Sequence, residues 1–216
     1  MGIISRFPAG ATEPYIEETY DSDGNLIDVK LHGYTKIRDY AFSNCYNLSL
    51  TSLPDEIVSI GANAFQNCFS LALTSLPAGI TSIGGSAFYN CESITLTSLP
   101  AGISSIENGA FYSCTHLALT NLPSGITHIG IEAFSECVNL ALTSIPAGIT
   151  SIGGSAFYGC TGLTELTFMG TPTSIAFDAF DGCENLTTIN VPWAEGAVAN
   201  APWGATNATI NYGHTG

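Results

Sequence analysis

Positive charge is the scarcest property of this chain. Lysine and arginine number 4 against 18 aspartates and glutamates, which gives a formal net charge of −14. The basic residues are Arg6, Lys30, Lys36 and Arg38, and none follows Arg38. Nucleic acids are held by cationic side chains, and anionic lipid surfaces repel acidic proteins. We therefore expect no nucleic-acid partner. The partner is expected to be a protein or a cell-surface glycan, and the alternative is that the acidic residues only keep the chain soluble.

Long apolar runs are also missing. No stretch approaches the roughly 18 consecutive apolar residues of a membrane helix, so we expect no membrane insertion. The opening residues, MGIISRFPAG, lack the apolar core of a secretory signal peptide. We therefore expect a protein that stays in the cytoplasm, or one that leaves the cell inside an assembly or by lysis. Apolar residues nevertheless make up 45% of the chain, which is typical of a packed core and not of disorder.

Motifs that carry chemistry are absent as well. The sequence has no CxxC, P-loop, GxSxG or HExxH pattern. The serines and cysteines occupy repeated positions, so none is singled out beside a catalytic base. Acidic residues fall at different repeat positions and predict no glycosidase pair. We expect a non-enzymatic protein without a cofactor or a metal ion.

What the chain has instead is a repeat. One unit reads AFQNCFSLALTSLPAGITSIGGS, from Ala64 to Ser86, and related units run in register from about Leu31 to Pro192. Two residue types recur every 23 positions, at Cys45, Cys68, Cys91, Cys114, Cys137, Cys160 and Cys183, and at Phe42, Phe65, Phe88, Phe111, Phe134, Phe157 and Phe180. So short a unit cannot close its own core, and stacking the units buries a continuous one. The repeat therefore predicts a solenoid of about seven coils.

Each unit holds two short extended pieces. The segment LALTSLP favours a strand, and AGITSIG supplies a second one. Gly84 and Gly85 then break the chain before the AFxxC turn. No segment keeps a helical period, so we expect at most a helical or 3₁₀ turn at AFxxC. The predicted fold is mainly β, with short parallel strands.

The run LTSLPAGITSIGGSAFYNC resembles the BspA-like subclass of leucine-rich repeats, over about three quarters of the chain. This resemblance implies a leucine-rich-repeat solenoid and says little about activity, because the family is spread among bacterial surface adhesins, protist proteins and phage proteins. The last two units place Leu163, Leu166 and Phe168 closer to the usual strand spacing of the family. The strand register of the first five units is therefore open.

The two ends leave the repeat, and we expect them to cap it. Residues 1–30 form an N-terminal segment with a β-hairpin, 31–192 the solenoid and 193–216 a C-terminal cap. The hairpin turn is predicted at DSDGN. The alternative is a calcium loop of Asp21, Asp23, Asn25 and Asp28, whose spacing departs from that of an EF-hand.

The C-terminal segment holds the only two tryptophans, Trp193 and Trp203. We expect them to cover the last coil, and the alternative is a pair on which a sugar ring stacks. This ending, the opening residues and the hairpin resemble leucine-rich-repeat proteins encoded among virion genes of gut bacteriophages. That resemblance implies display on a phage virion, and the family resemblance implies a bacterial cell surface.

The cysteines admit several interpretations. Zinc needs four converging ligands, whereas one cysteine per coil forms a line. Adjacent coils put equivalent Cα atoms about 5 Å apart, which a disulfide can span. However, seven is an odd number, and a uniform stack designates no partners. Because free cysteine packs as a small apolar group, we expect a reduced and buried ladder.

Binding is then the remaining function, and two sets of residues favour it. A threonine stripe begins at Thr51 and continues with the candidate binding residues Thr74, Thr97, Thr120 and Thr143, and large amphipathic side chains follow the repeated phenylalanine at Tyr89, Tyr112 and Tyr158. The main hypothesis is a recognition or adhesion module, and the second is a structural spacer, decoration or assembly protein of a virion. Ice or mineral binding by the stripe is a third, and a homo-oligomer is left open. The plainest alternative is that the stripe only solvates a strand.

Overall fold

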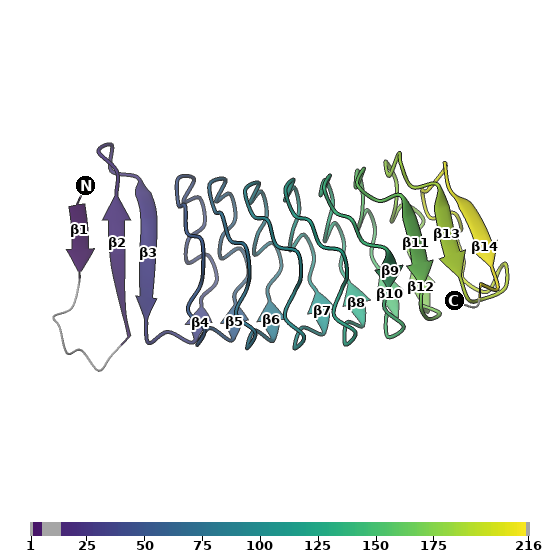
Figure 1. Ribbon diagram of the computed structural model, residues 1–216, viewed down its shortest axis with the longest axis horizontal. Coiled ribbons are helices and arrows are strands. Elements are labelled where there is room, and N and C mark those ends of the chain that lie inside the picture. Colours follow the sequence, from purple (N-terminus) through teal and green to yellow (C-terminus); the bar gives the residue numbers. More distant parts are fainter. Residues whose placement is uncertain (1, 6–13, 215–216) are drawn as a thin grey trace.

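The computed structural model describes residues 2–5 and 14–214 and shows an elongated β-solenoid of about eight stacked turns of roughly 23 residues (Figure 1). The predicted fold class is confirmed. The stack has one turn more than the repeat has units, because the segment after Pro192 adds a turn. The N–H of Phe180 donates to the carbonyl of Trp203, and the last strand pairs with the one before it.

An antiparallel sheet stands at the N-terminal end. It consists of β1 (Gly2–Ser5), β2 (Tyr15–Tyr20) and β3 (Leu26–His32), in that order. The hairpin between β2 and β3 turns at Asp21, whose Oδ1 accepts the backbone N–H groups of Asp23 and Asn25 at 2.9 and 2.8 Å. The Asn25 side-chain amide also donates to the Asp21 Oδ2 at 2.9 Å, and this bond, followed by the backbone bonds, lowers the pKa of the Asp21 carboxyl. The loop is thus a turn held by its own carboxylate, and within residues 2–5 and 14–214 no group of three or more His, Cys, Asp or Glu is placed to hold a metal ion.

One wall of the solenoid is built from two-residue strands. They are β4 (Lys36–Ile37), β5 (Ser59–Ile60), β6 (Ser82–Ile83), β7 (Ser105–Ile106), β8 (His128–Ile129), β10 (Ser151–Ile152) and β12 (Ser174–Ile175). They pair in parallel in two sheets, β4-β5-β6 and β7-β8-β10-β12. In each strand the isoleucine is buried and the preceding polar residue faces outward. This wall is the AGITSIG piece of the repeat.

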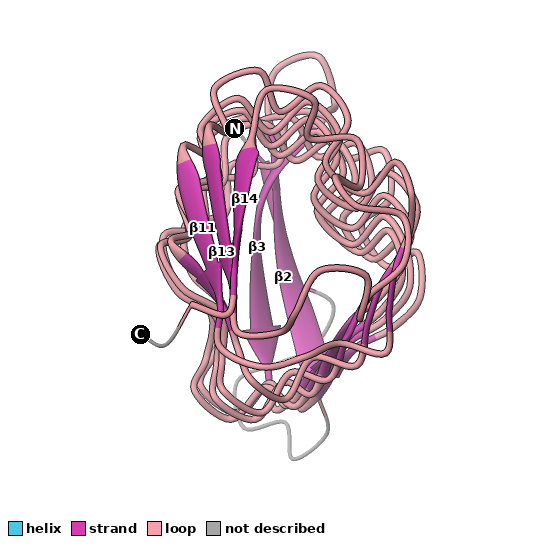
Figure 2. Cartoon of the chain, turned by 90° about the vertical axis from the view of Figure 1, so that its right-hand side faces the viewer, coloured by secondary structure: helices cyan, strands magenta, loops and turns pink. Residues whose placement is uncertain are grey.

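The opposite wall holds strands only toward the C-terminal end. They are the two-residue β9 (Ser144–Ile145) and the four-residue β11 (Glu165–Phe168), β13 (Thr188–Val191) and β14 (Thr209–Tyr212), paired in parallel in the order β9-β11-β13-β14. Figure 2 shows them on one side of the coil and the strands of the first wall on the other. The described part of the chain contains no helix, and so none that is long and apolar enough to cross a membrane.

The prediction of a strand at LALTSLP is wrong for the first units. Leu71 and Leu73 are buried there, but Thr74 and Ser75 are both exposed, and a pleated strand cannot turn two successive side chains outward. The coils are joined at this point by single backbone bonds, such as Ala72 N–H to the Leu50 carbonyl at 3.1 Å. Strands form where the apolar residues alternate, as in β11 with its buried Leu166 and Phe168.

The AFxxC segment forms isolated tight turns, so the predicted helical or 3₁₀ turn is wrong. The residue before each cysteine has a positive φ of 55–72°, at Asn44, Asn67, Asn90, Ser113, Glu136, Gly159 and Gly182. A left-handed residue interrupts a right-handed helix, and asparagine and glycine adopt that conformation most readily. Alternate backbone N–H groups bond across to the next coil, as from Phe65 to the Ala87 carbonyl at 2.8 Å, and the others close local turns, as from Cys68 to the Phe65 carbonyl at 3.1 Å.

Glycine is required where neighbouring coils come close. A Cβ on Gly84 would collide with the backbone nitrogen of Ala62 in the preceding coil. The same holds two units later, since a Cβ on Gly130 would lie 2.6 Å from the Asn108 nitrogen, although the unit between them has Glu107 at this position. Glycine therefore permits this close approach after β5, β6, β8 and β10, whereas Arg38, Glu107 and Ala176 follow β4, β7 and β12.

Stacked phenylalanine rings fill the core. The seven repeated phenylalanines are at most 6% exposed, and the ring centroids of neighbours lie 5.0–5.6 Å apart from Phe42 to Phe180. Such offset stacking is favourable beyond the area that it buries. The ladder runs through the whole repeat and joins every coil to its two neighbours.

The cysteines lie beside this ladder and are all free. The thiol of each one from Cys68 to Cys183 donates to the carbonyl of the phenylalanine one coil back, at 3.0 Å in every case. These six are buried, whereas Cys45 in the first coil is only partly buried, because no repeat precedes it. Burial raises the pKa of all seven thiols.

Thiol labelling tests this arrangement directly. In the native protein, a maleimide reagent is expected to modify Cys45 within minutes and to leave the other six cysteines unmodified until the chain unfolds. The reason is that only the Cys45 sulfur is reached by solvent while the ladder is intact. Mass spectrometry of the labelled protein counts the adducts, and Cys45→Ala is the control that should remove the fast one. Rapid addition to two or more thiols in that variant contradicts the buried ladder.

The two tryptophans seal the C-terminal end. Trp203 is fully buried and Trp193 is 6% exposed, with ring centroids 6.3 Å apart and both packed on Phe168. The Trp203 Nε1–H donates to the Ala199 carbonyl at 2.7 Å. Neither ring has a free face for a sugar, so the stacking alternative for this pair is wrong.

Candidate binding surfaces

The threonine stripe lies on the wall that carries β9 and β11. Thr74, Thr97, Thr120 and Thr143 are all exposed, one in each of four consecutive coils. The stripe ends at the next unit, because the equivalent residue is Leu166, which is buried in β11. With coils about 4.8 Å apart, the four hydroxyls span roughly 15 Å, the length of a short oligosaccharide or of four to five extended residues.

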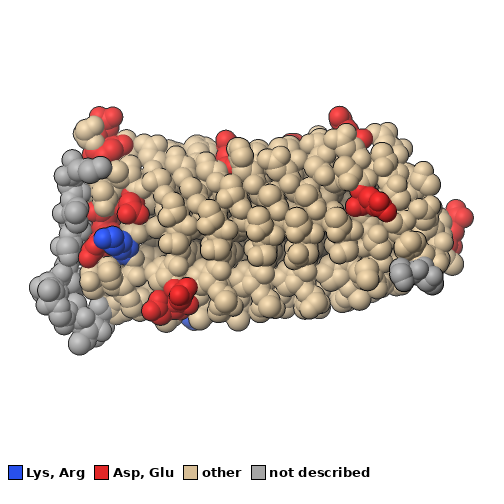
Figure 3. Space-filling view, viewed as in Figure 1, with Lys and Arg blue, Asp and Glu red and all other residues tan. Residues whose placement is uncertain are grey.

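Charge is absent from the surface around this stripe. The segments 72–79, 95–102, 118–125 and 141–148 contain no Asp, Glu, Lys or Arg. Figure 3, drawn from the side on which β11 and β13 lie in front, shows the same result: the middle of the face is uncharged, and acidic side chains lie toward the ends and rims. The stripe therefore offers hydroxyls and small apolar groups, and no counter-ion for a charged ligand.

The tyrosines do not join this surface. They lie in the cysteine turns, which follow the two-residue strands, and so on a different side of the coil from the stripe. Tyr89 and Tyr112 stack in parallel, with ring centroids 4.4 Å apart. The pKa of the Tyr112 hydroxyl is raised, mainly by burial and to a smaller extent by the neighbouring Tyr89. Tyr158 stands two coils away, separated from Tyr112 by the unit of Ser135, and is 40% exposed.

A second aromatic pair was missed by the sequence analysis. Tyr46 and Phe69 follow the cysteine in the first two units, are 52% and 39% exposed, and stack with centroids 5.5 Å apart. The signal was available, since the same position holds Glu92 and Thr115 in the next two units. Aromatic residues occupy this exposed position only in the first two units, since the later units have Glu92, Thr115, Val138, Thr161 and Glu184 there.

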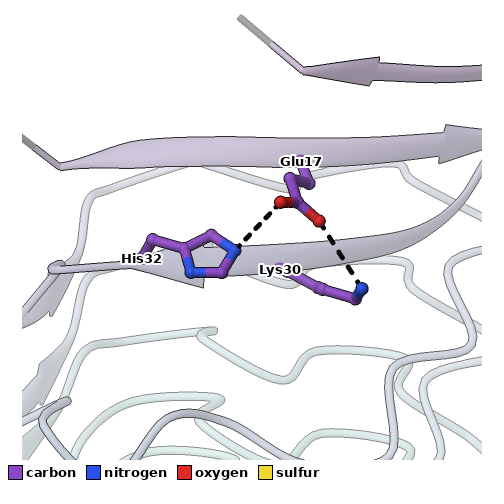
Figure 4. Close-up of polar contacts among 3 residues, drawn as sticks. All are labelled: Glu17, Lys30 and His32. Atoms are coloured by element: carbon purple, nitrogen blue, oxygen red, sulfur yellow. Dashed lines mark ion pairs between the residues drawn. The ribbon is translucent and has the colours of Figure 1, made fainter. Parts of the chain in front are cut away.

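Both ion pairs of the described residues lie on the N-terminal hairpin, and both involve Glu17. Lys30 Nζ and His32 Nε2 both lie 3.5 Å from the Glu17 carboxylate (Figure 4). The His32 contact is an ion-pair distance without hydrogen-bond geometry. The His32 ring also stacks on Tyr15, with centroids 4.3 Å apart. Glu17 thus neutralises Lys30 on the outer face of the hairpin.

A cleft of about 630 Å³ separates this hairpin from the first coil. It is lined on one side by residues 27–31 of β3 and on the other by residues 49–54. Its apolar lining includes Val29, Leu31, Leu50 and Leu53, each at most 9% exposed. The sequence analysis did not find it, because it arises where an irregular cap meets a regular repeat.

These features define the class of the molecule, a β-solenoid of the leucine-rich-repeat type. The chain belongs to the BspA type leucine rich repeat family, whose model matches residues 35–161 and 127–196 with six copies of the repeat. The resemblance inferred from the repeat is thereby confirmed for the family, while a phage origin stays a proposal.

Solved structures show the same fold. A leucine-rich-repeat protein of T. pallidum superposes with a TM-score of 0.63 at 28% identity, covering 83% of this chain and 90% of that one. A leucine-rich-repeat protein of Bacteroides ovatus gives a TM-score of 0.54 at 25% identity and covers 82% of this chain. This chain spans only 52% of the length of the Bacteroides protein. No curated protein matches the sequence.

Proposed function

We propose that this chain is a non-enzymatic recognition module that binds a protein or a cell-surface glycan through the threonine stripe. The observation that carries the proposal is the uncharged, hydroxyl-bearing surface over four regular coils. Extended surfaces created by stacking are where solenoids commonly bind. A surface without charge matches neutral sugars and neutral protein patches, because these partners need hydrogen bonds and no counter-ion.

Display at a bacterial surface or on a phage virion is part of the same proposal. BspA-like proteins are often surface-displayed, and leucine-rich-repeat solenoids are generally non-enzymatic. The charge of −14 supports a partner that is neither nucleic acid nor anionic lipid.

Retention on bacterial envelope fractions tests the proposal. The double variant Thr97→Lys/Thr120→Lys is expected to lose about tenfold or more in retention, since two buried unpaired ammonium groups in the contact are strongly unfavourable. Ser104→Lys adds one positive charge, half of that in the double variant, to an exposed residue near the two-residue strands and should bind normally. Protease or periodate treatment of the envelope separates a protein ligand from a glycan. No retention on any fraction, or an equal loss in Ser104→Lys, contradicts the proposal.

A structural role as a spacer or virion decoration is the second candidate, and the continuous phenylalanine ladder favours it. A stack in which each coil is bonded to both neighbours is stiff along its length. This role predicts that the protein sediments with purified particles or forms defined oligomers. A strict monomer that is absent from particles contradicts it.

A further inference from the structure

The cleft between the hairpin and the first coil has the layout of an unfilled strand position. On one edge β3 pairs with β2 over its whole length. On its other edge, within the described residues, its only backbone bond to the first coil runs from the Ser49 N–H to the Ile27 carbonyl, at 2.9 Å. Successive residues of an antiparallel strand turn their N–H and C=O groups to alternate edges. Beyond Ile27, β3 therefore presents unpaired backbone donors and acceptors to the cleft.

The far side of the cleft is equally open. Residues 51–53 of the first coil form no backbone hydrogen bond to β3, although the Leu50 carbonyl is bonded on its other side to Ala72. Strands within a sheet lie about 4.8 Å apart. The cleft of about 630 Å³ interrupts this regular spacing between β3 and the first coil.

From this geometry we propose that the cleft binds an extended peptide segment of another protein as an added β-strand between β3 and residues 51–54, beyond the point where Ser49 bonds directly to Ile27. The main chain of the peptide pairs with the free edge of β3, which is the β-augmentation mode of recognition. Alternate side chains enter the apolar lining formed by Val29, Leu31 and Leu53, which suits valine, isoleucine or leucine. This site adjoins the start of the threonine row at Thr51, but it lies outside the coils of Thr74 to Thr143 and does not depend on the function proposed for them.

The charge at the cleft selects the outward side chains of that segment. Lys30 is neutralised by Glu17, at 3.5 Å, whereas Asp28 on the same strand has no salt bridge within the described residues. The chain as a whole carries −14. Outward lysine or arginine residues are therefore favoured over acidic ones, so that the partner is a basic strand with alternate apolar residues.

A synthetic hexapeptide of alternating valine and lysine, acetylated and amidated at its ends, is the probe. Titration calorimetry with the full chain is expected to show one site. The fully backbone N-methylated peptide should bind about tenfold or more weakly, the loss expected from removing two or more backbone hydrogen bonds. A peptide with glutamate in place of lysine should also bind more weakly. Equal binding of the methylated peptide, or no binding of the parent at millimolar concentration, overturns the proposal.

Protein variants locate the site. Ser52 is exposed and lines the cleft, so Ser52→Trp should block it and weaken the peptide by about tenfold or more. Ser75→Trp is the matched control, because Ser75 occupies the same position one coil later, outside the cleft. Hydrogen exchange should slow at β3 amides when the peptide binds. Equal effects of the two variants, unchanged β3 exchange, or dimerisation of the protein through the hairpin in place of peptide binding each contradict the assignment.

Discussion

Raising the pH from 8 to 11 is expected to unfold the solenoid cooperatively, because six thiols are buried in its core. Burial raises the pKa of Cys68 and Cys183 to about 12, and those of Cys91, Cys114 and Cys160 well above the ordinary value. Thiols of the unfolded chain titrate near pH 8.5. Above that pH the unfolded chain has released protons that the native state still holds, so the free energy of unfolding falls as the pH rises.

The size of the effect follows from the number of thiols. Their contribution is complete below about pH 8.5 and is lost as the pH rises toward the native pKa values. Each buried thiol lowers the free energy of unfolding by about 1.4 kcal/mol per pH unit in this window. Six of them give about 8 kcal/mol per pH unit, comparable with the whole stability of a typical domain.

Urea unfolding followed by circular dichroism at a series of pH values measures this slope, and thiolate absorbance should appear together with unfolding. The double variant Cys91→Ala/Cys114→Ala is the control. Its stability at pH 7 is lower, but its slope between about pH 9 and 11 should fall by roughly a third, since two of six titrating groups are gone. A slope that is the same in both proteins would show that the thiols are not its source.

Truncation of one core ring is the second large effect. Phe111→Ala is expected to lower the free energy of unfolding by about 3–5 kcal/mol. Phe111 is fully buried, and its ring stacks between those of Phe88 and Phe134, at 5.4 and 5.6 Å. The cavity cannot collapse, because the backbone bonds between coils hold both neighbouring rings at their spacing. Chemical denaturation followed by fluorescence or circular dichroism measures the change.

The matched control for this variant is Phe177→Ala. Phe177 has the same side chain but is 73% exposed, so its truncation should change the free energy of unfolding by at most about 0.5 kcal/mol. Equal destabilisation of the two variants, or a loss below about 1 kcal/mol for Phe111→Ala, would contradict a core built on the ring ladder.

Much of the architecture could be predicted from the repeat. A period of 23 residues with Phe42 and Cys45 in fixed places requires stacked coils, and stacking puts equivalent side chains in contact. The burial of Ile60 and its equivalents follows from the alternation in TSIG. For Thr74 and Ser75 the sequence showed only that the strand register was open, because two adjacent polar residues fit neither a strand nor a regular turn.

Other features could not be predicted from local residue preferences. Ser113 and Glu136 take the left-handed conformation that Asn44 and Gly182 take, although serine and glutamate do not favour it. Their conformation is imposed by the following coil, to which the N–H groups of Ser113 and Glu136 donate at 2.8 and 2.7 Å. The cleft beside β3 was missed for a related reason: it depends on how two different kinds of structure meet, which no repeat pattern encodes.

The unequal ends of the stack give the molecule a direction. At the C-terminal end Trp193 and Trp203 cover the last rings, whereas at the N-terminal end Cys45 is partly open and β3 touches the first coil through one backbone bond. In a linear array of coupled units, loss of structure starts at the terminus with the weakest junction and moves along the stack. Under a pulling force the solenoid should therefore unfold coil by coil from its N-terminal end, and the end covered by the tryptophans should unfold last.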